Sequence, residues 1–166
     1  MTIPEVERAH IRARLRRIVI DSRALKAAIE EEFGVDFDRA QWAAAFESAE
    51  PEDVNRVSAV VAAFERIVNG LVESARSGLL ASGLARPGGA PESVRGDLER
   101  VRDDGGLSDG QLEVLLFASQ VRNELQHVYI EAKADTVRDA VQRLRSNLPE
   151  ILKRLNAWFT RYRVGV

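Results

Sequence analysis

Residues 108–132, SDGQLEVLLFASQVRNELQHVYIEA, hold the pattern that decides the fold. Ser108 and Gln111 form a capping box, in which each side chain satisfies a backbone N–H group at a helix start. Apolar residues then recur in alternating steps of four and three, at Val114, Ala118, Val121, Leu125, Val128 and Ala132. This spacing places one apolar stripe along a helix. The stretch therefore predicts a single helix whose stripe packs against a core or a partner helix.

Helical spacing continues on both sides of this stretch, and no segment shows a convincing strand pattern. The other predicted helices cover about 3–33, a short segment with Trp42 and Phe46, 51–80, 92–102 and 136–162. A Gly- and Pro-rich loop is expected at 83–91. The sequence contains no repeat and no domain boundary. It therefore predicts an all-α protein in which residues 1–166 form one helical domain.

Particular residues are expected to mark the ends and bends of these helices. Thr2 fits a capping box with Glu5, and Gly34 is expected to end the first long helix. Asp135 is expected to cap the last helix, and Pro149 to kink or split it. The helix that begins at Pro51 contains Gly70 and Gly78. Each glycine predicts either close packing against a neighbouring helix or a weak point in the helix.

Composition limits the available chemistry. The 166 residues include no Cys and only two His, His10 and His127. Disulfides, thiolate metal sites and cysteine nucleophiles are therefore excluded, and we expect no metal and no cofactor. No apolar run approaches the roughly 18 residues of a membrane helix, and the N-terminal segment lacks a signal-like apolar region. A cytoplasmic protein that does not enter the membrane is expected.

The net charge of −2 hides an uneven distribution. Residues 1–30 carry seven basic and four acidic residues, a balance of +3. Residues 31–117 carry eight and 17, a balance of −9, and residues 118–166 carry nine and five, a balance of +4. If the two ends pack together, the fold presents a positive patch that the total conceals.

A group of polar residues lies around the apolar stripe of residues 108–132: Arg122, Asn123, His127 and Tyr129. On an ideal helix Arg122 and His127 point about 140° apart, so they meet only through the reach of Arg, a local distortion or a second copy of the helix. His can move a proton near neutral pH, and the Arg fork matches a phosphate. These groups suffice for metal-free cleavage of RNA, which supplies its own 2′-hydroxyl nucleophile.

The sequence RNELQHVY at 122–129 resembles the R-x4-H-x-Y motif of the HEPN superfamily, and more narrowly that of HepT-like toxins. These toxins are paired with minimal nucleotidyltransferase antitoxins. The order of predicted helices around the motif is also similar, over about 54–160. The resemblance implies an antiparallel bundle of about five to six helices. Residues 1–50 lie outside the resemblance and are expected to form an N-terminal helical extension.

The resemblance also implies roles for single residues. Arg122 and His127 match the catalytic pair of the family, Asn123 matches its frequent polar partner, and Tyr129 matches the tyrosine that the antitoxin can modify with AMP. Family members form homodimers in which two motifs meet. The expected function is a metal-independent endoribonuclease toxin that cleaves RNA and is neutralised by a cognate nucleotidyltransferase antitoxin.

Two other functions remain open. One is a non-catalytic HEPN-like module that uses its amphipathic helices for protein binding or assembly. The other is a regulatory protein that binds nucleotides in the motif cleft. The three functions differ in whether the protein cleaves RNA and in whether mutation of His127 changes its activity.

Three further groups of residues each allow a functional or a structural interpretation. His10 and its basic neighbours form an RNA-contacting helix or, as we favour, a solvated face: Arg8, Arg12, Arg14, Arg16 and Arg17. The C-terminal aromatic residues stack bases or, as we favour, pack in a core or dimer: Trp158, Phe159 and Tyr162. One acidic group suggests a metal site or, as we favour, a capped turn: Asp103, Asp104 and Asp109.

Overall fold

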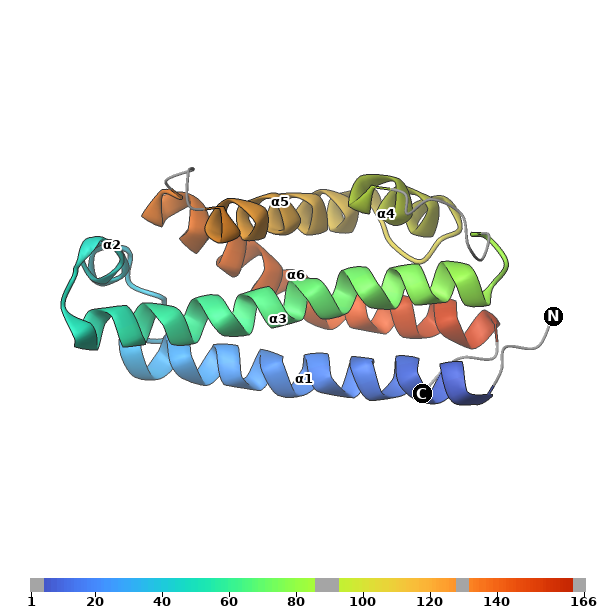
Figure 1. Ribbon diagram of the computed structural model, residues 1–166, viewed down its shortest axis with the longest axis horizontal. Coiled ribbons are helices and arrows are strands. Elements are labelled where there is room, and N and C mark those ends of the chain that lie inside the picture. The colour runs from blue at the N-terminus through green and yellow to red at the C-terminus, as the bar shows by residue number, and fades with distance from the viewer. Residues whose placement is uncertain (1–4, 86–92, 128–131, 163–166) are drawn as a thin grey trace.

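The computed structural model describes residues 5–85, 93–127 and 132–162. These ranges hold six helices and no strand, so the predicted all-α class is confirmed (Figure 1). The helices are α1 (Glu5–Phe33), α2 (Arg39–Glu47), α3 (Pro51–Ala81), α4 (Val94–Asp103), α5 (Asp109–Gln126) and α6 (Ala134–Arg161). None of the described helices has an apolar stretch long enough to cross a membrane.

Local sequence signals explain most helix boundaries. Gly34, at φ +76°, adopts the left-handed conformation that ends α1, because glycine has no Cβ to clash there. Asp38 caps α2 by accepting a hydrogen bond from the Gln41 backbone N–H at 2.8 Å. Pro51 lies in the first turn of α3, where its missing N–H is not needed. The predictions for Gly34 and Pro51 are confirmed.

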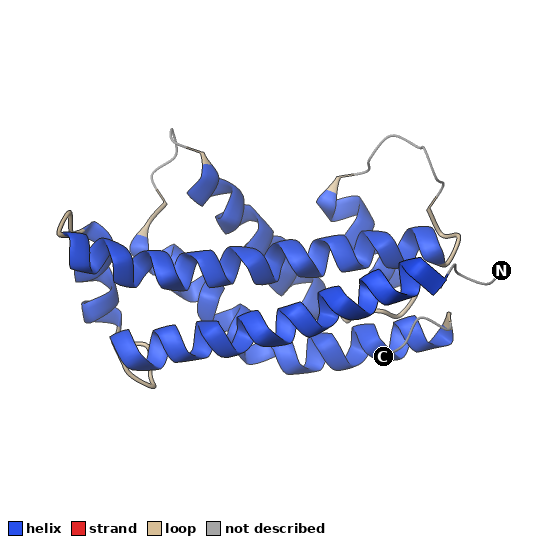
Figure 2. Ribbon diagram, turned by 60° about the horizontal axis from the view of Figure 1, so that its bottom comes forward, coloured by secondary structure: helices blue, strands red, loops and turns tan. Residues whose placement is uncertain are grey.

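The long helix α3 packs against every other described helix. Its pairing with α1 is antiparallel, since Arg14 of α1 contacts Ser77 while Asp21 contacts Arg66 earlier on α3. The two helices lie side by side in both overall views (Figures 1 and 2). On the other side of α3, α5 packs against α6 and α4 connects to the start of α5. One continuous cluster of buried apolar side chains joins all six helices.

The two glycines of α3 lie where neighbouring helices approach closely. A Cβ at Gly70 would lie 2.8 Å from the Ile18 side chain of α1. A Cβ at Gly78 would overlap the rings of Trp158 and Phe159 of α6. Of the two predictions for these positions, close packing is confirmed. Trp158 and Phe159 are each only 1% exposed, so their predicted packing role is confirmed as well.

Several predicted helix and loop boundaries either differ from the structure or fall outside the described residues. The helix predicted over 108–132 is wrong at its end, because α5 ends at Gln126 and His127 has extended angles of φ −97° and ψ 113°. The residues that follow, Val128, Tyr129 and Ile130, are β-branched or aromatic and favour helix weakly, and they lie outside the described residues. Thr2 and positions 86–91 of the predicted loop also lie outside them.

The start of α6 differs from the prediction too. Its N-cap is Lys133, which makes no side-chain capping bond, and Asp135 is inside the first turn. There the Asp135 carboxylate binds Arg39 at 2.9 Å and lies at the positive end of the helix dipole. Pro149 lies inside α6, which remains one helix and changes direction along its length (Figure 1). The prediction that Pro149 splits the helix is wrong, and the bent course agrees with a kink.

Candidate functional site

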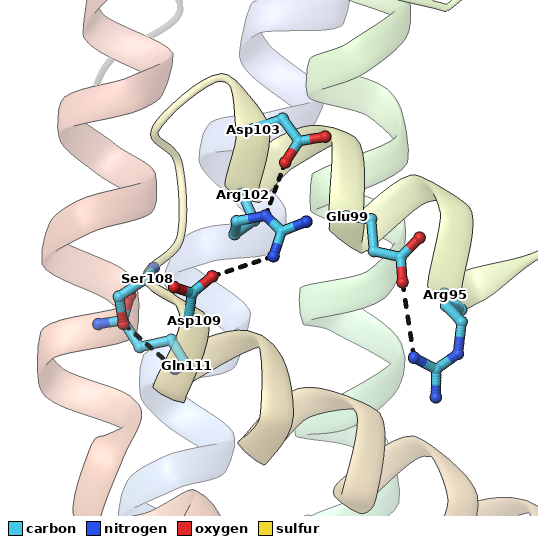
Figure 3. Close-up of polar contacts among 7 residues, drawn as sticks. All are labelled: Arg95, Glu99, Arg102, Asp103, Ser108, Asp109 and Gln111. Carbon is cyan, nitrogen blue, oxygen red and sulfur yellow. Dashed lines mark hydrogen bonds and ion pairs between the residues drawn. The ribbon is translucent and has the colours of Figure 1, made fainter.

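The start of α5 is fixed by polar contacts (Figure 3). Ser108 accepts a hydrogen bond from the Gln111 N–H at 3.2 Å, and the Gln111 side chain accepts one from the Ser108 N–H at 2.9 Å. Arg102 of α4 binds Asp103 at 2.6 Å and Asp109 at 3.0 Å. The predicted capping box is confirmed, and an arginine between the two carboxylates supports the capped-turn interpretation of the acidic group.

The third acid of that group, Asp104, joins the same turn to the end of α6. Its carboxylate accepts hydrogen bonds from Trp158 Nε1 at 2.7 Å and from the Tyr162 hydroxyl at 2.5 Å. Burial alone would raise the pKa of Asp104, but the bonds from Tyr162 and Trp158 and the charge of Arg161 lower it below its usual value. These contacts hold the turn before α5 against the end of α6.

The C-terminal end of α5 carries Arg122 and Asn123, His127 follows it as the C-cap, and a residue from α3 joins Arg122. The Arg122 guanidinium donates to the Asn123 side-chain oxygen from Nε at 3.1 Å and from Nη2 at 2.6 Å. Its Nη1 donates to the side-chain oxygen of Asn69 on α3. Arg122 is half-buried between the two amides. The site therefore has a member that the motif does not contain.

Asn69 is not among the residues that the sequence singles out. Its signal is a polar side chain inside the apolar run Ile67-Val68-Asn69-Gly70-Leu71 of α3, where its neighbours Val68 and Leu71 are fully buried. Such a residue is either solvated or bonded. Nothing in the linear sequence reveals that its partner is Arg122, 53 positions away.

The charge of Arg122 is not neutralised by a carboxylate within the described ranges. Both of its partners are neutral amides, whereas several arginines of α1 and α3 pair with acids, as Arg66 does with Asp21 at 2.9 Å. The nearest acid along the chain, Glu124, accepts a hydrogen bond from Gln120 at 3.0 Å. Arg122 is thus oriented and retains full positive charge, which suits an anion such as phosphate.

His127 lies just beyond the helix end, and its side chain is exposed. Its backbone N–H donates to the Asn123 carbonyl at 3.2 Å and to the Glu124 carbonyl at 3.4 Å. The imidazole makes no hydrogen bond to Arg122 or Asn123 in the part of the chain that is described. The structure therefore brings Arg122, Asn123 and Asn69 together and places His127 one turn away. Tyr129 lies outside the described residues.

Two open hollows flank the C-terminal half of α5. One, of about 420 Å³, lies between the start of α4 and α5, and its lining includes Arg95, Phe117, Gln120 and Asn123. The other, also about 420 Å³, is mainly apolar and lies against α2 and α3, with Leu125 and Glu65 in its lining. Of these two hollows, the one between α4 and α5 is the one that Asn123 borders.

The remaining sequence candidates do not join this site. His10 is exposed on α1, and two of its basic neighbours are paired: Arg14 with Glu73 at 3.3 Å and Arg17 with Asp21 at 3.2 Å. These pairs favour a balanced, solvated face for that part of α1. Within the described residues, no three His, Asp or Glu side chains gather as metal ligands do.

Comparison with protein-family models, with curated proteins and with solved structures finds no match to this chain.

Proposed function

We propose that the protein is a HEPN-type, metal-independent endoribonuclease that acts in the cytoplasm as the toxin of a toxin–antitoxin pair. The observation that carries the proposal is the Arg122 guanidinium, which two amide oxygens hold in place without neutralising its charge. Beside it, the RNELQHVY motif supplies the one exposed imidazole at this end of α5 in the described part of the chain.

The chemistry follows from these two groups. His127 accepts the proton of an RNA 2′-hydroxyl, and the 2′ oxygen forms a bond to the adjacent phosphorus. The bond from phosphorus to the 5′ oxygen breaks, and that oxygen takes a proton from an imidazolium or from water. Arg122 stabilises the charge that grows on the phosphate oxygens. The products are a 2′,3′-cyclic phosphate and a 5′-hydroxyl.

A second copy completes the site in this proposal. His127 and Arg122 of one chain are not in contact, and His127 is exposed at a helix end, where a second chain is able to approach. In a homodimer, the imidazole of one copy and the guanidinium of the other act on the same phosphate. The cognate nucleotidyltransferase antitoxin blocks this cleft by transferring AMP to Tyr129.

The test is cleavage of a single-stranded RNA by purified protein in excess chelator. His127→Ala and Arg122→Ala are each expected to lower the rate by at least about 100-fold, as loss of a proton-transfer group or of a charge-stabilising group does. His10→Ala is the matched control, since His10 is the other histidine of the chain and is exposed on α1. Full activity of His127→Ala, or equal loss in His10→Ala, would contradict the assignment. Absence of any cleavage favours the non-catalytic alternative.

A further inference from the structure

The seam between α1 and the C-terminal half of α6 is open at the surface. Figure 2 shows these two helices next to each other along the face that is turned forward from Figure 1. A groove of about 280 Å³ lies between them. Its apolar floor consists of Leu15, Val19 and Leu152, and its polar lining consists of Arg16, Lys153 and Asn156.

The groove has a basic rim. Arg16 of α1 and Lys153 of α6 line it, and Arg23 lies one helical turn beyond Val19 on the same face of α1. Within the described residues, neither Arg16 nor Arg23 forms an ion pair. Lys153 contacts Glu150 only at 3.6 Å, and its side chain is 77% exposed. This rim differs from the opposite side of α1, where Arg14 and Arg17 are paired with acids.

Apolar side chains beside the rim are exposed to solvent. Val19 is 38% exposed and the adjacent Ile20 is 53% exposed, although Leu15 below them is buried. The volume is below the range of roughly 300–1,000 Å³ that is usual for small-molecule sites. A nucleic acid would match the positive rim through its phosphates and would leave the apolar floor unused. A ligand that uses both features carries apolar and negative groups close together, as an acidic amphipathic helix does.

We propose that this groove docks an acidic amphipathic helix of a partner protein. Aliphatic side chains of that helix pack on Leu15, Val19 and Leu152, and its flanking carboxylates bind Arg16, Arg23 and Lys153. This mode of recognition buries one face of a helix in a groove while complementary charges fix its orientation. The proposal does not rest on the nuclease function, because the groove shares no residue with the Arg122 site.

The test uses a fluorescent designed peptide of about 18 residues, long enough to form a helix on binding. Leu occupies positions i, i+3, i+4 and i+7, and Glu occupies the flanking positions. One control peptide replaces every Glu by Lys, and a second replaces every Leu by Ala. Wild-type protein is expected to bind the first peptide at least about tenfold more tightly than either control. Equal binding of the three peptides would overturn the proposal.

Protein variants locate the binding. Arg16→Glu combined with Arg23→Glu is expected to weaken peptide binding at least about tenfold, and Val19→Ser several-fold. Arg154→Glu is the control, because Arg154 is exposed, does not line the groove and donates instead to the Gly105 carbonyl at 3.3 Å, and it is expected to leave binding unchanged. Equal weakening by Arg154→Glu would overturn the proposal. So would displacement of the peptide by single-stranded RNA whose own binding depends on Arg16 and Arg23 but not on Val19.

Discussion

Arg122 is bound by two amide oxygens rather than by a carboxylate. A carboxylate in place of either amide would hold the guanidinium more strongly and cancel the charge that a phosphate requires. An amide orients the guanidinium through its carbonyl oxygen and keeps its NH₂ group available as a further donor. The choice of Asn at 69 and 123 is therefore informative about function, and it distinguishes this arginine from the paired arginines of the surface.

This argument predicts the effect of Asn69→Asp, a change of nearly equal volume. The variant is expected to fold with stability within about 1 kcal/mol of wild type, since partly exposed ion pairs contribute little. RNA cleavage is expected to fall at least about tenfold, because the new carboxylate neutralises Arg122. Urea unfolding and initial rates on one RNA substrate measure the two effects. Undiminished cleavage by Asn69→Asp would show that the charge of Arg122 is not used.

Asp104 acts at the scale of helices, since it joins the α4–α5 turn to the end of α6. Its pKa in the folded protein is lowered, against the effect of burial, by the bonds from Tyr162 and Trp158. A lowered pKa contributes stability that is present above the unfolded value of about 3.9 and is lost as pH falls through the folded value.

Asp104→Asn is therefore expected to unfold more easily than wild type at pH 7 and to approach wild type as the pH falls below about 4. Urea midpoints measured from pH 7 to pH 2 on both proteins follow this convergence. The amide that replaces the carboxylate keeps an oxygen for Trp158, so the comparison isolates the charge. A difference between the two proteins that stays constant over the whole range would contradict the role of the Asp104 carboxylate.

Helix boundaries that carry a local capping signal are easier to predict from this sequence than boundaries that depend on contacts elsewhere in the fold. Ser108 with Gln111, and Pro51, act through neighbours in the sequence, and the structure confirms both. The end of α5 escapes prediction because Leu125, Val128 and Ala132 keep the apolar spacing beyond Gln126, and periodicity alone does not reveal where a helix ends. The start of α6 depends on tertiary contacts: Ala134 accepts a hydrogen bond from Trp42 at 2.8 Å, and Asp135 binds Arg39.

At the scale of the whole molecule, the structure shows where the basic segments of the sequence lie. The basic N-terminal and C-terminal segments contact each other through α1 and α6, and the groove between them has a basic rim. The Arg122 site lies at the end of α5 and shares no lining residue with that groove. The sequence motif contains Arg122, Asn123 and His127. The further member, Asn69, requires the fold, because α3 must pass beside the end of α5 to bring it there.

The most direct test of the nuclease proposal is the chemistry of the RNA ends. Wild-type protein in excess chelator is expected to leave 2′,3′-cyclic phosphate and 5′-hydroxyl ends, detected by mass spectrometry of a single oligonucleotide. The same oligonucleotide with 2′-O-methyl groups is expected to remain intact, because the nucleophile is blocked. Ends with a 3′-hydroxyl and a 5′-phosphate, or equal cleavage of the methylated RNA, would contradict catalysis by His127 and Arg122.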